Sequence, residues 1–152
     1  MIFVTVGTHH QPFQRLLDGL EDLGEQDLVV QFGSGREPAR AARAAAFMPF
    51  DEIVSYFREA EKVITHAGVG SIICARREGH LPLVVPRRAD LGEHVDEHQV
   101  ELSAALSERG SVISVEDVAD LRARLDAAPS RRPPAELEAD DLGAAVRSAL
   151  LG

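Results

Sequence analysis

The sequence has little of what secreted and membrane-embedded proteins usually carry. It holds one cysteine, Cys74, in 152 residues, so no disulfide can form within the chain. No apolar run approaches the roughly 20 residues that span a bilayer. The opening Met1-Ile2-Phe3-Val4 shows no basic segment ahead of an apolar run and no cleavage site. We therefore expect a cytoplasmic protein that reaches a membrane only through a partner.

Basic residues are also scarce. The chain has 16 lysines and arginines against 25 aspartates and glutamates, for a formal net charge of −9. Binding along nucleic acid or anionic lipid needs clustered basic side chains, so we expect neither as a direct partner. An anionic ligand would have to be bound by a few groups at one site and not by a broad basic surface. A hydrophobic fraction of 45% and a charged fraction of 27% are ordinary for a folded globular protein.

Short apolar runs alternate with longer segments of helical periodicity, which is the pattern of βαβ units and a parallel sheet. The run 43–47 is rich in alanine and ambiguous, but its place between a strand and a helix favours a strand. We predict a doubly wound, Rossmann-like α/β domain with about six parallel strands, forming half of a larger architecture. The expected strands are 2–6, 28–32, 43–47, 62–65, 83–85 and 111–114, and the expected helices are 12–24, one capped by Asp51, 71–77, 95–108 and 116–127.

The chain is expected to divide into three parts. Residues 1–128 would form the α/β domain. The proline-rich stretch 129–134 suits neither a helix nor a central strand, so we interpret it as a linker. Residues 135–152 carry apolar side chains on one helical face and would form a helix that packs either on the domain or on a partner.

The run from His66 to Ser71 follows an expected strand and opens an expected helix. Ligands of parallel sheets bind where strands end and helix N-termini point outward. We expect Gly68 and Gly70 to reach positive φ and bring backbone N–H groups close to an anion, beside the Ser71 hydroxyl. The result would be a diphosphate cradle. Taken alone, Gly-x-Gly is equally typical of a tight turn without a ligand.

The order of features from Phe47 to Gln99 resembles the C-terminal, donor-binding domain of glycosyltransferase family 28. The resemblance is carried by residues 47–50, 60–72, Gly79, 84–87, 96–99 and Leu102. The opening 2–8 is more similar to single-domain members that work with a membrane-associated subunit.

This resemblance implies one half of a GT-B glycosyltransferase that needs no metal cofactor. Such a chain would bind a UDP-sugar and, together with a membrane-associated acceptor-binding subunit, transfer a hexosyl or N-acetylhexosaminyl group with inversion. The acceptor would be lipid-linked, in polysaccharide or glycoconjugate synthesis. The protein would lie peripherally at the inner membrane through that partner, and in isolation it could pair with itself.

The resemblance also implies roles for individual positions. The general base belongs to the other domain of the resembling enzymes, so no residue here is confidently catalytic; His9 and His10 are open candidates, against ordinary loop histidines. The implied donor-site residues are His66, Gly68, Gly70 and Ser71 for the diphosphate, Phe47 and Met48 for the base, His98 and Gln99 for the sugar, and Gly7 and Thr8 at the cleft rim.

One position departs from the family's pattern. Cys74 stands where relatives carry a glutamate that holds the ribose hydroxyls, and a thiol is a poor acceptor for a diol. Either Glu78 or Glu93 substitutes for it, or donor affinity or base selectivity differs. Cys74 itself suits the part of a small buried hydrophobic residue.

Two other functions stay open on the sequence. His94-Val95-Asp96-Glu97-His98 matches the His-x-x-Glu-His pattern of inverted zinc peptidases, in which two histidines on one helical face bind zinc. Alternatively, the domain binds a nucleotide sugar without catalysis and acts as a regulatory module.

Overall fold

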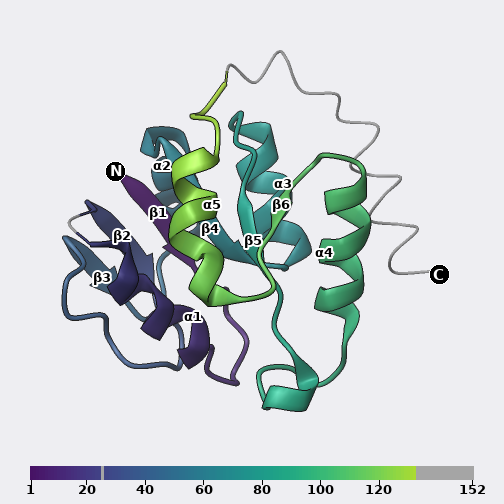
Figure 1. Ribbon diagram of the computed structural model, residues 1–152. Coiled ribbons are helices and arrows are strands. Elements are labelled where there is room, and N and C mark those ends of the chain that lie inside the picture. The colour runs from purple at the N-terminus through teal and green to yellow at the C-terminus, as the bar shows by residue number, and fades with distance from the viewer. Residues whose placement is uncertain (25, 133–152) are drawn as a thin grey trace.

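Short apolar runs form one parallel sheet in the computed structural model, which describes residues 1–24 and 26–132 (Figure 1). Within that part of the chain the strand order is β3-β2-β1-β4-β5-β6. This is the order of the doubly wound, Rossmann-like fold, so the predicted fold class is confirmed. The strands are β1 (Ile2–Thr5), β2 (Leu28–Gln31), β3 (Arg43–Ala45), β4 (Lys62–His66), β5 (Leu83–Val85) and β6 (Ile113–Ser114).

Both faces of the sheet are covered, which is why β1, β2, β4 and β5 are buried along almost their whole length instead of alternating between buried and exposed residues. Ile2 and Val4 of β1 pack on one side, and Phe3 between them packs on the other. Helices α1 (Gln14–Gly19) and α5 (Leu121–Ala127), with the 3₁₀ turn η1 (Leu20–Leu23), cover the first side. Helices α2 (Phe50–Glu59), α3 (Val69–Arg77) and α4 (His98–Glu108) cover the second (Figure 1). Two further 3₁₀ turns are η2 (Ala89–Leu91) and η3 (Val118–Asp120).

Several helix boundaries differ from the prediction. Asp51 does not cap α2, because the helix begins one residue earlier and its N-cap is Pro49, with no side-chain hydrogen bond. The expected helix 12–24 is shorter and ends in the 3₁₀ turn η1. Helix α3 begins at Val69 rather than 71, and α4 begins at His98 rather than 95. Both shifts move predicted site residues to the first turn of a helix.

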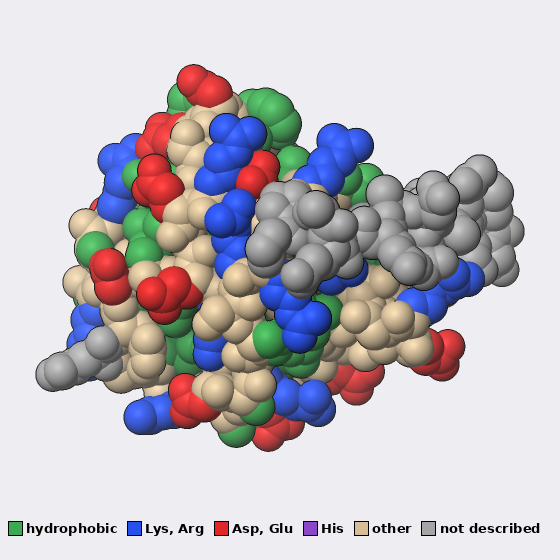
Figure 2. Space-filling model, turned by 90° about the horizontal axis from the view of Figure 1, so that it is seen from above, with side chains coloured by type: hydrophobic (Ala, Val, Ile, Leu, Met, Phe, Trp, Pro, Cys, Tyr) green, Lys and Arg blue, Asp and Glu red, His purple; other side chains and the backbone are tan. Residues whose placement is uncertain are grey.

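The segment after α5 lies against the edge at which the strands begin. The backbone N–H of Arg131 donates to the Glu61 carbonyl at 3.0 Å, and that of Arg132 donates to the Gly79 carbonyl at 2.7 Å. Figure 2 looks onto this edge, where Lys and Arg side chains are mixed with Asp and Glu. The rest of the expected linker, and the expected helix 135–152, lie outside the described residues.

Candidate functional site

The glycine-rich turn that the sequence suggested as a donor site lies at the switch point of the sheet. The order of strands reverses between β1 and β4, and ligands of open parallel sheets bind outside the carboxyl ends at such a point. Gly7 follows β1, and His66 ends β4. A Cβ on Gly7 would lie 2.4 Å from His66 Nε2, so the two strand ends are in direct contact there.

The imidazole of His66 explains why glycine stands on both sides of it. A Cβ on Gly68 would lie 2.1 Å from His66 Cε1, and Gly7 has a φ of +77° in addition to its close approach. The predicted positive φ of Gly68 and Gly70 is wrong: Gly68 has φ −84°, and Gly70 is not among the positive-φ glycines. Gly68 is needed because the ring occupies the space of a side chain. A Cβ on Gly70 would meet nothing within 4 Å.

The N-terminus of α3 faces this contact. Gly68 is the N-cap residue and makes no side-chain cap, and the first turn contains no acidic residue. The first N–H groups of a helix have no acceptor within it and carry the positive end of the helix dipole. With the Ser71 hydroxyl 3.4 Å from His66 Nε2, this corner offers an anion several donors at once.

His66 is buried and neutral. Burial, followed by the charge of Arg87, lowers its pKa to about 3. The Gln99 side-chain amide lies 3.2 Å from His66 Nδ1. The imidazole therefore enters the site as a polar group without a charge of its own.

Gln99 is turned inward in the structure. Its side chain is 8% exposed, and its oxygen accepts hydrogen bonds from the backbone N–H groups of Ala67 at 3.2 Å and Arg87 at 3.1 Å. The amide thus joins the turn after β4 to the end of β5. Contact between Gln99 and a donor sugar stays a prediction, and it would engage an amide that already holds the turn together.

Arg87 is a residue whose role the sequence did not reveal. Its side chain is 1% exposed and donates to the carbonyls of Val6 and Gln11, each at 2.7 Å, and of Glu93 at 3.0 Å. The guanidinium also lies 5.0 Å from the centre of the Phe13 ring. Burial lowers its pKa to about 10, so it remains charged at neutral pH. One buried cation thus holds the loops after β1 and β5.

Gln31 also joins separate segments of the chain, on the other side of Gly7. Its amide nitrogen donates to Thr5 Oγ1 at 3.0 Å and to the Gly7 carbonyl at 3.3 Å. Its oxygen accepts from the backbone N–H of Met48 at 2.9 Å. The only signal in the sequence was a polar residue at the end of an apolar strand.

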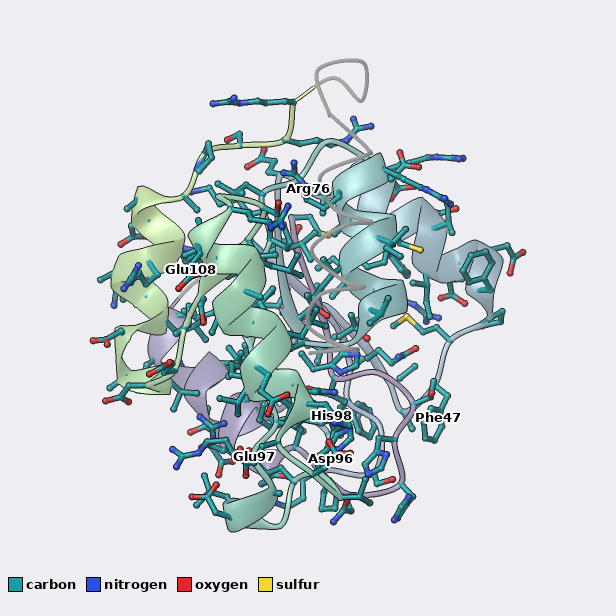
Figure 3. All side chains as sticks on the ribbon, turned by 90° about the vertical axis from the view of Figure 1, so that its right-hand side faces the viewer. Phe47, Arg76, Asp96, Glu97, His98 and Glu108 are labelled. Atoms are coloured by element: carbon teal, nitrogen blue, oxygen red, sulfur yellow. The ribbon has the colours of Figure 1, made fainter. Side chains whose placement is uncertain are left out.

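The two predicted base-binding residues differ in exposure. Met48 is buried and packs with Phe3 and Phe57 under α2, so its side chain belongs to the core. Phe47 is 54% exposed. Figure 3 shows Phe47 at the same end of the molecule as His98, opposite Arg76. A base could therefore meet the Phe47 ring and the backbone beside it; the role itself stays a prediction.

Both proposed substitutes for the ribose glutamate are paired with arginines. Glu78 lies at the far end of α3 and pairs with Arg58 at 3.1 Å and Arg131 at 3.4 Å. Glu93 is buried, with both carboxylate oxygens 3.0 Å from the Arg15 guanidinium. Cys74 is half-buried against the core under α3, and burial raises the pKa of its thiol. Glu78 and Glu93 therefore offer no unpaired carboxylate to the ribose, and Cys74 has none to offer.

Histidines form the rim after β1 and β5. His9 stacks on His94 with ring centres 4.6 Å apart, and its Nε2 lies 2.6 Å from Gln11 Oε1. Asp96 Oδ2 is 3.1 Å from His98 Nδ1. The predicted rim residue Thr8 is exposed, as is His10 two residues later on the same loop.

The geometry does not support the zinc-peptidase alternative. His94 precedes α4 and so does not share a helical face with His98, as the peptidase pattern requires. In the part of the chain that the structure describes, no three histidine, cysteine, aspartate or glutamate side chains converge in a way that could hold a metal ion.

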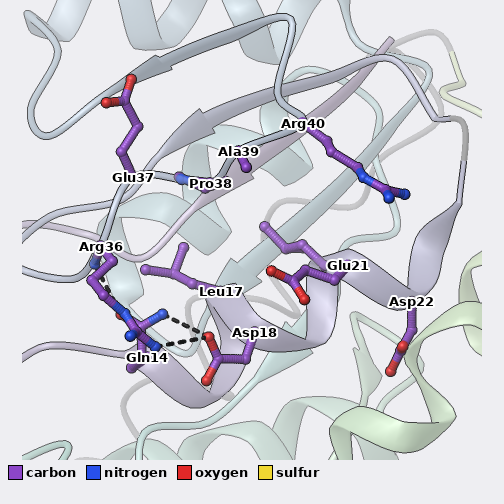
Figure 4. Close-up of a pocket in the computed structure, with 11 residues that line it drawn as sticks. Gln14, Leu17, Asp18, Glu21, Asp22, Arg36, Glu37, Pro38, Ala39 and Arg40 are labelled. Atoms are coloured by element: carbon purple, nitrogen blue, oxygen red, sulfur yellow. Dashed lines mark hydrogen bonds and ion pairs between the residues drawn. The ribbon is translucent and has the colours of Figure 1, made fainter.

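A pocket of about 550 Å³ lies away from the glycine-rich turn, between α1, η1 and the loop 36–40 (Figure 4). Its walls mix basic and acidic side chains, and Arg36 pairs with Asp18 across it at 3.6 Å. None of the predicted donor-site residues lines it. It serves below as a reference surface for binding experiments.

A family model described as the glycosyltransferase family 28 C-terminal domain matches residues 1–145. The chain belongs to this family. No curated protein matches it. Among the residues described, no helix is both long enough and apolar enough to cross a membrane.

Two solved structures are similar to this family 28 domain. The glycosyltransferase of kitacinnamycin matches with a TM-score of 0.50 at 20% identity, over 99% of this chain and 39% of that chain. The glycosyltransferase SnogD from Streptomyces nogalater matches with a TM-score of 0.45 at 19% identity, over 99% and 43%. The chain thus spans well under half the length of either protein. At this identity the first match supports the fold alone.

Buried neutral histidines predict how the family 28 domain responds to acid. The folded-state pKa of His66, about 3, lies below its ordinary value of 6.5, so below pH 6.5 the unfolded chain binds a proton that the folded chain excludes. Stability should therefore fall with pH by about 1.4 kcal/mol per pH unit for this residue. Burial also lowers the pKa of His80, which adds in the same direction.

Urea unfolding at pH 7.5, 6.0 and 5.0 measures this slope. His66→Gln should lower this slope by the contribution of one titrating group, about 1.4 kcal/mol per pH unit, because glutamine does not bind a proton in this pH range. An identical slope for the two proteins would show that His66 is not held neutral by the fold.

Proposed function

We propose that this domain binds a UDP-sugar and is the donor-binding subunit of an inverting, metal-independent glycosyltransferase. The transferred group would be a hexosyl or N-acetylhexosaminyl unit, and the acceptor a lipid-linked one in polysaccharide or glycoconjugate synthesis. The observation that carries the proposal is the corner at the switch point, where neutral His66 and Ser71 lie beside the uncapped N-terminus of α3. Family membership supports the reaction class.

The charges around this corner suit a diphosphate leaving group. As the bond to the sugar breaks, negative charge grows on the diphosphate, and preorganised donors lower the barrier without reorganising. The α3 N-terminus supplies such donors, and buried Arg87 adds a fixed positive charge whose hydrogen bonds reach only backbone carbonyls. These groups support a reaction that proceeds without a divalent cation.

The surface around the corner supports a partner on the acceptor side. Four large hydrophobic side chains of the described chain are exposed: Phe47 and Phe50 at the start of α2, and Leu91 and Val95 between β5 and α4. All four lie in the segments that follow β3 and β5, at the carboxyl ends of the strands. Exposed apolar side chains of this kind mark protein or ligand contacts. A membrane-associated subunit with the general base would cover them, and isolated protein could pair through them.

A ligand panel tests the proposed function. UDP, UDP-glucose and UDP-N-acetylglucosamine should raise the melting temperature, with or without EDTA, whereas ADP should not. Ser71→Ala should weaken the best ligand about tenfold, because a hydrogen bond to a charged group contributes roughly 1.5–3 kcal/mol. Ser107→Ala, at the far end of α4, is the matched control. No shift with any uridine nucleotide would overturn the proposal.

One observation favours a second function, a nucleotide-sugar-binding module without catalysis. Cys74 and the absence of a free carboxylate from Glu78 and Glu93 leave the ribose less firmly held. Protein mixed with its membrane partner and UDP-sugars should release UDP if the enzyme reading is right. Binding without release, while both subunits are folded, would favour the module.

A further inference from the structure

The side-chain amide of Gln99 has one orientation that satisfies its neighbours. One end meets the backbone N–H groups of Ala67 and Arg87, at 3.2 and 3.1 Å. A backbone N–H only donates, so the amide oxygen must be at that end. The NH₂ group must then be at the other end, 3.2 Å from His66 Nδ1.

This orientation decides where His66 carries its proton. An NH₂ group only donates, so Nδ1 must be the bare, accepting nitrogen. A neutral imidazole with a bare Nδ1 carries its hydrogen on Nε2. Nε2 is the atom that lies 3.4 Å from Ser71 Oγ, between Gly7 and the start of α3.

Burial and charge block the alternative in which both nitrogens are protonated. Burial and the Arg87 charge lower the pKa of His66 to about 3, and His94 and His9 oppose protonation further. Arg87 is itself fixed to the same amide through its backbone N–H. Nδ1 therefore faces a hydrogen-bond donor, and the other groups that shift the pKa of His66 are positively charged or neutral. No carboxylate is among them.

We propose that Gln99 is a positioning residue that keeps the single hydrogen of His66 on Nε2, so that His66 presents a fixed N–H donor to a phosphate oxygen. The inference rests on the proposed function for the identity of the acceptor, but not for the position of the hydrogen. It gives Gln99 a role behind the site, acting through His66. It also explains why an uncharged histidine, rather than lysine or arginine, is useful here: it offers a donor with a set direction at every physiological pH.

The first experiment reads the hydrogen directly in the free protein. In ¹⁵N-labelled protein, the two ring nitrogens of a neutral histidine give separate resonances according to which one is protonated. His66 should show a protonated Nε2 and a bare Nδ1, unchanged from pH 5.5 to pH 8.5. A protonated Nδ1, or a ring that titrates near 6.5, the ordinary value for histidine, would overturn the inference whether or not any nucleotide binds.

The second experiment is designed to move the hydrogen of His66 from Nε2 to Nδ1. Gln99→Glu keeps an oxygen for the N–H groups of Ala67 and Arg87 but replaces the NH₂ with an acceptor. Nδ1 should then take the hydrogen, leaving Nε2 bare at high pH and protonated only when the ring becomes charged. UDP-glucose affinity at pH 8.5 should fall about tenfold and recover as the pH is lowered, whereas wild-type affinity stays flat.

A charge control separates this effect from repulsion. Ser107→Glu adds the same charge at an exposed position in the last turn of the same helix, away from the site. It should leave the His66 resonances in their wild-type pattern and the affinity independent of pH. If Gln99→Glu retains a bare Nδ1, or if its affinity is as flat as that of wild type, Gln99 does not position the hydrogen. If wild type binds no UDP-sugar, the proposed function fails while the resonances still decide the inference.

Discussion

Gly68→Ala should cost about 2–3 kcal/mol of folding stability, whereas Gly70→Ala, two residues later, should cost none. A Cβ at 68 would lie 2.1 Å from the His66 ring, which Gln99 holds in place and which therefore cannot move aside cheaply. A Cβ at 70 meets nothing within 4 Å, and alanine favours a helix by up to about 1 kcal/mol over glycine. Urea unfolding of the two variants measures the difference.

The same pair separates the fold from the ligand. If a diphosphate lies against the start of α3, a methyl group at exposed Gly70 should weaken UDP-glucose binding more than tenfold while the melting temperature is kept or raised. Gly7→Ala should behave like Gly68→Ala and be worse, since its φ of +77° adds left-handed strain of about 1–2 kcal/mol. Equal stability losses at 68 and 70 would contradict the packing described around His66.

Arg87→Met should cost about 3–5 kcal/mol of folding stability, because it removes a buried donor group with several partners. It leaves the carbonyls of Val6, Gln11 and Glu93 without the donor that satisfies them, and a buried group left unpaired costs about 1–3 kcal/mol. Methionine fills much of the volume, so the loss reports hydrogen bonds rather than a cavity. The free energy of unfolding, measured by chemical denaturation, and the affinity for UDP-glucose should fall together, because both loops of the site lose the group that holds them.

The neighbouring arginine is the matched control. Arg88 pairs with Asp90 at 2.7 Å, but both side chains are about half exposed, at 44% and 54%. Surface ion pairs contribute roughly 0–1 kcal/mol, so Arg88→Met should change stability by less than that. Similar losses at 87 and 88 would mean that the buried guanidinium does not organise the loops.

The fold was predictable from the sequence because it depends on local patterns. The strands β1, β2, β4 and β5 are built around short apolar runs, and covering both faces of a parallel sheet requires that pattern. Even the alanine-rich run at 43–47 was predicted correctly, since a strand of three residues, Arg43–Ala45, forms there at the sheet edge. Helix starts were predicted less accurately. A side-chain cap was expected at Asp51, but α2 begins at Phe50 without a side-chain cap.

The position of the candidate site in the fold was predictable, but the hydrogen bonds within it were not. The turn after β4 could be located because glycine and a strand-to-helix transition are visible in a sequence. The partners of Gln99, Arg87 and Gln31 could not, because each joins segments far apart in the chain. For the same reason the ion pairs of Glu78 and Glu93 could not be foreseen, because only the fold brings their basic partners close.

The most direct test of the central claim is an amide NMR titration of the domain with UDP-N-acetylglucosamine. The account predicts saturable shifts concentrated at Gly7 and at residues 68–71, where the α3 N-terminus and the strand ends meet. The pocket lined by Asp18, Arg36 and Arg40 should show none. Shifts centred on that pocket, or no shifts at millimolar ligand, would contradict it.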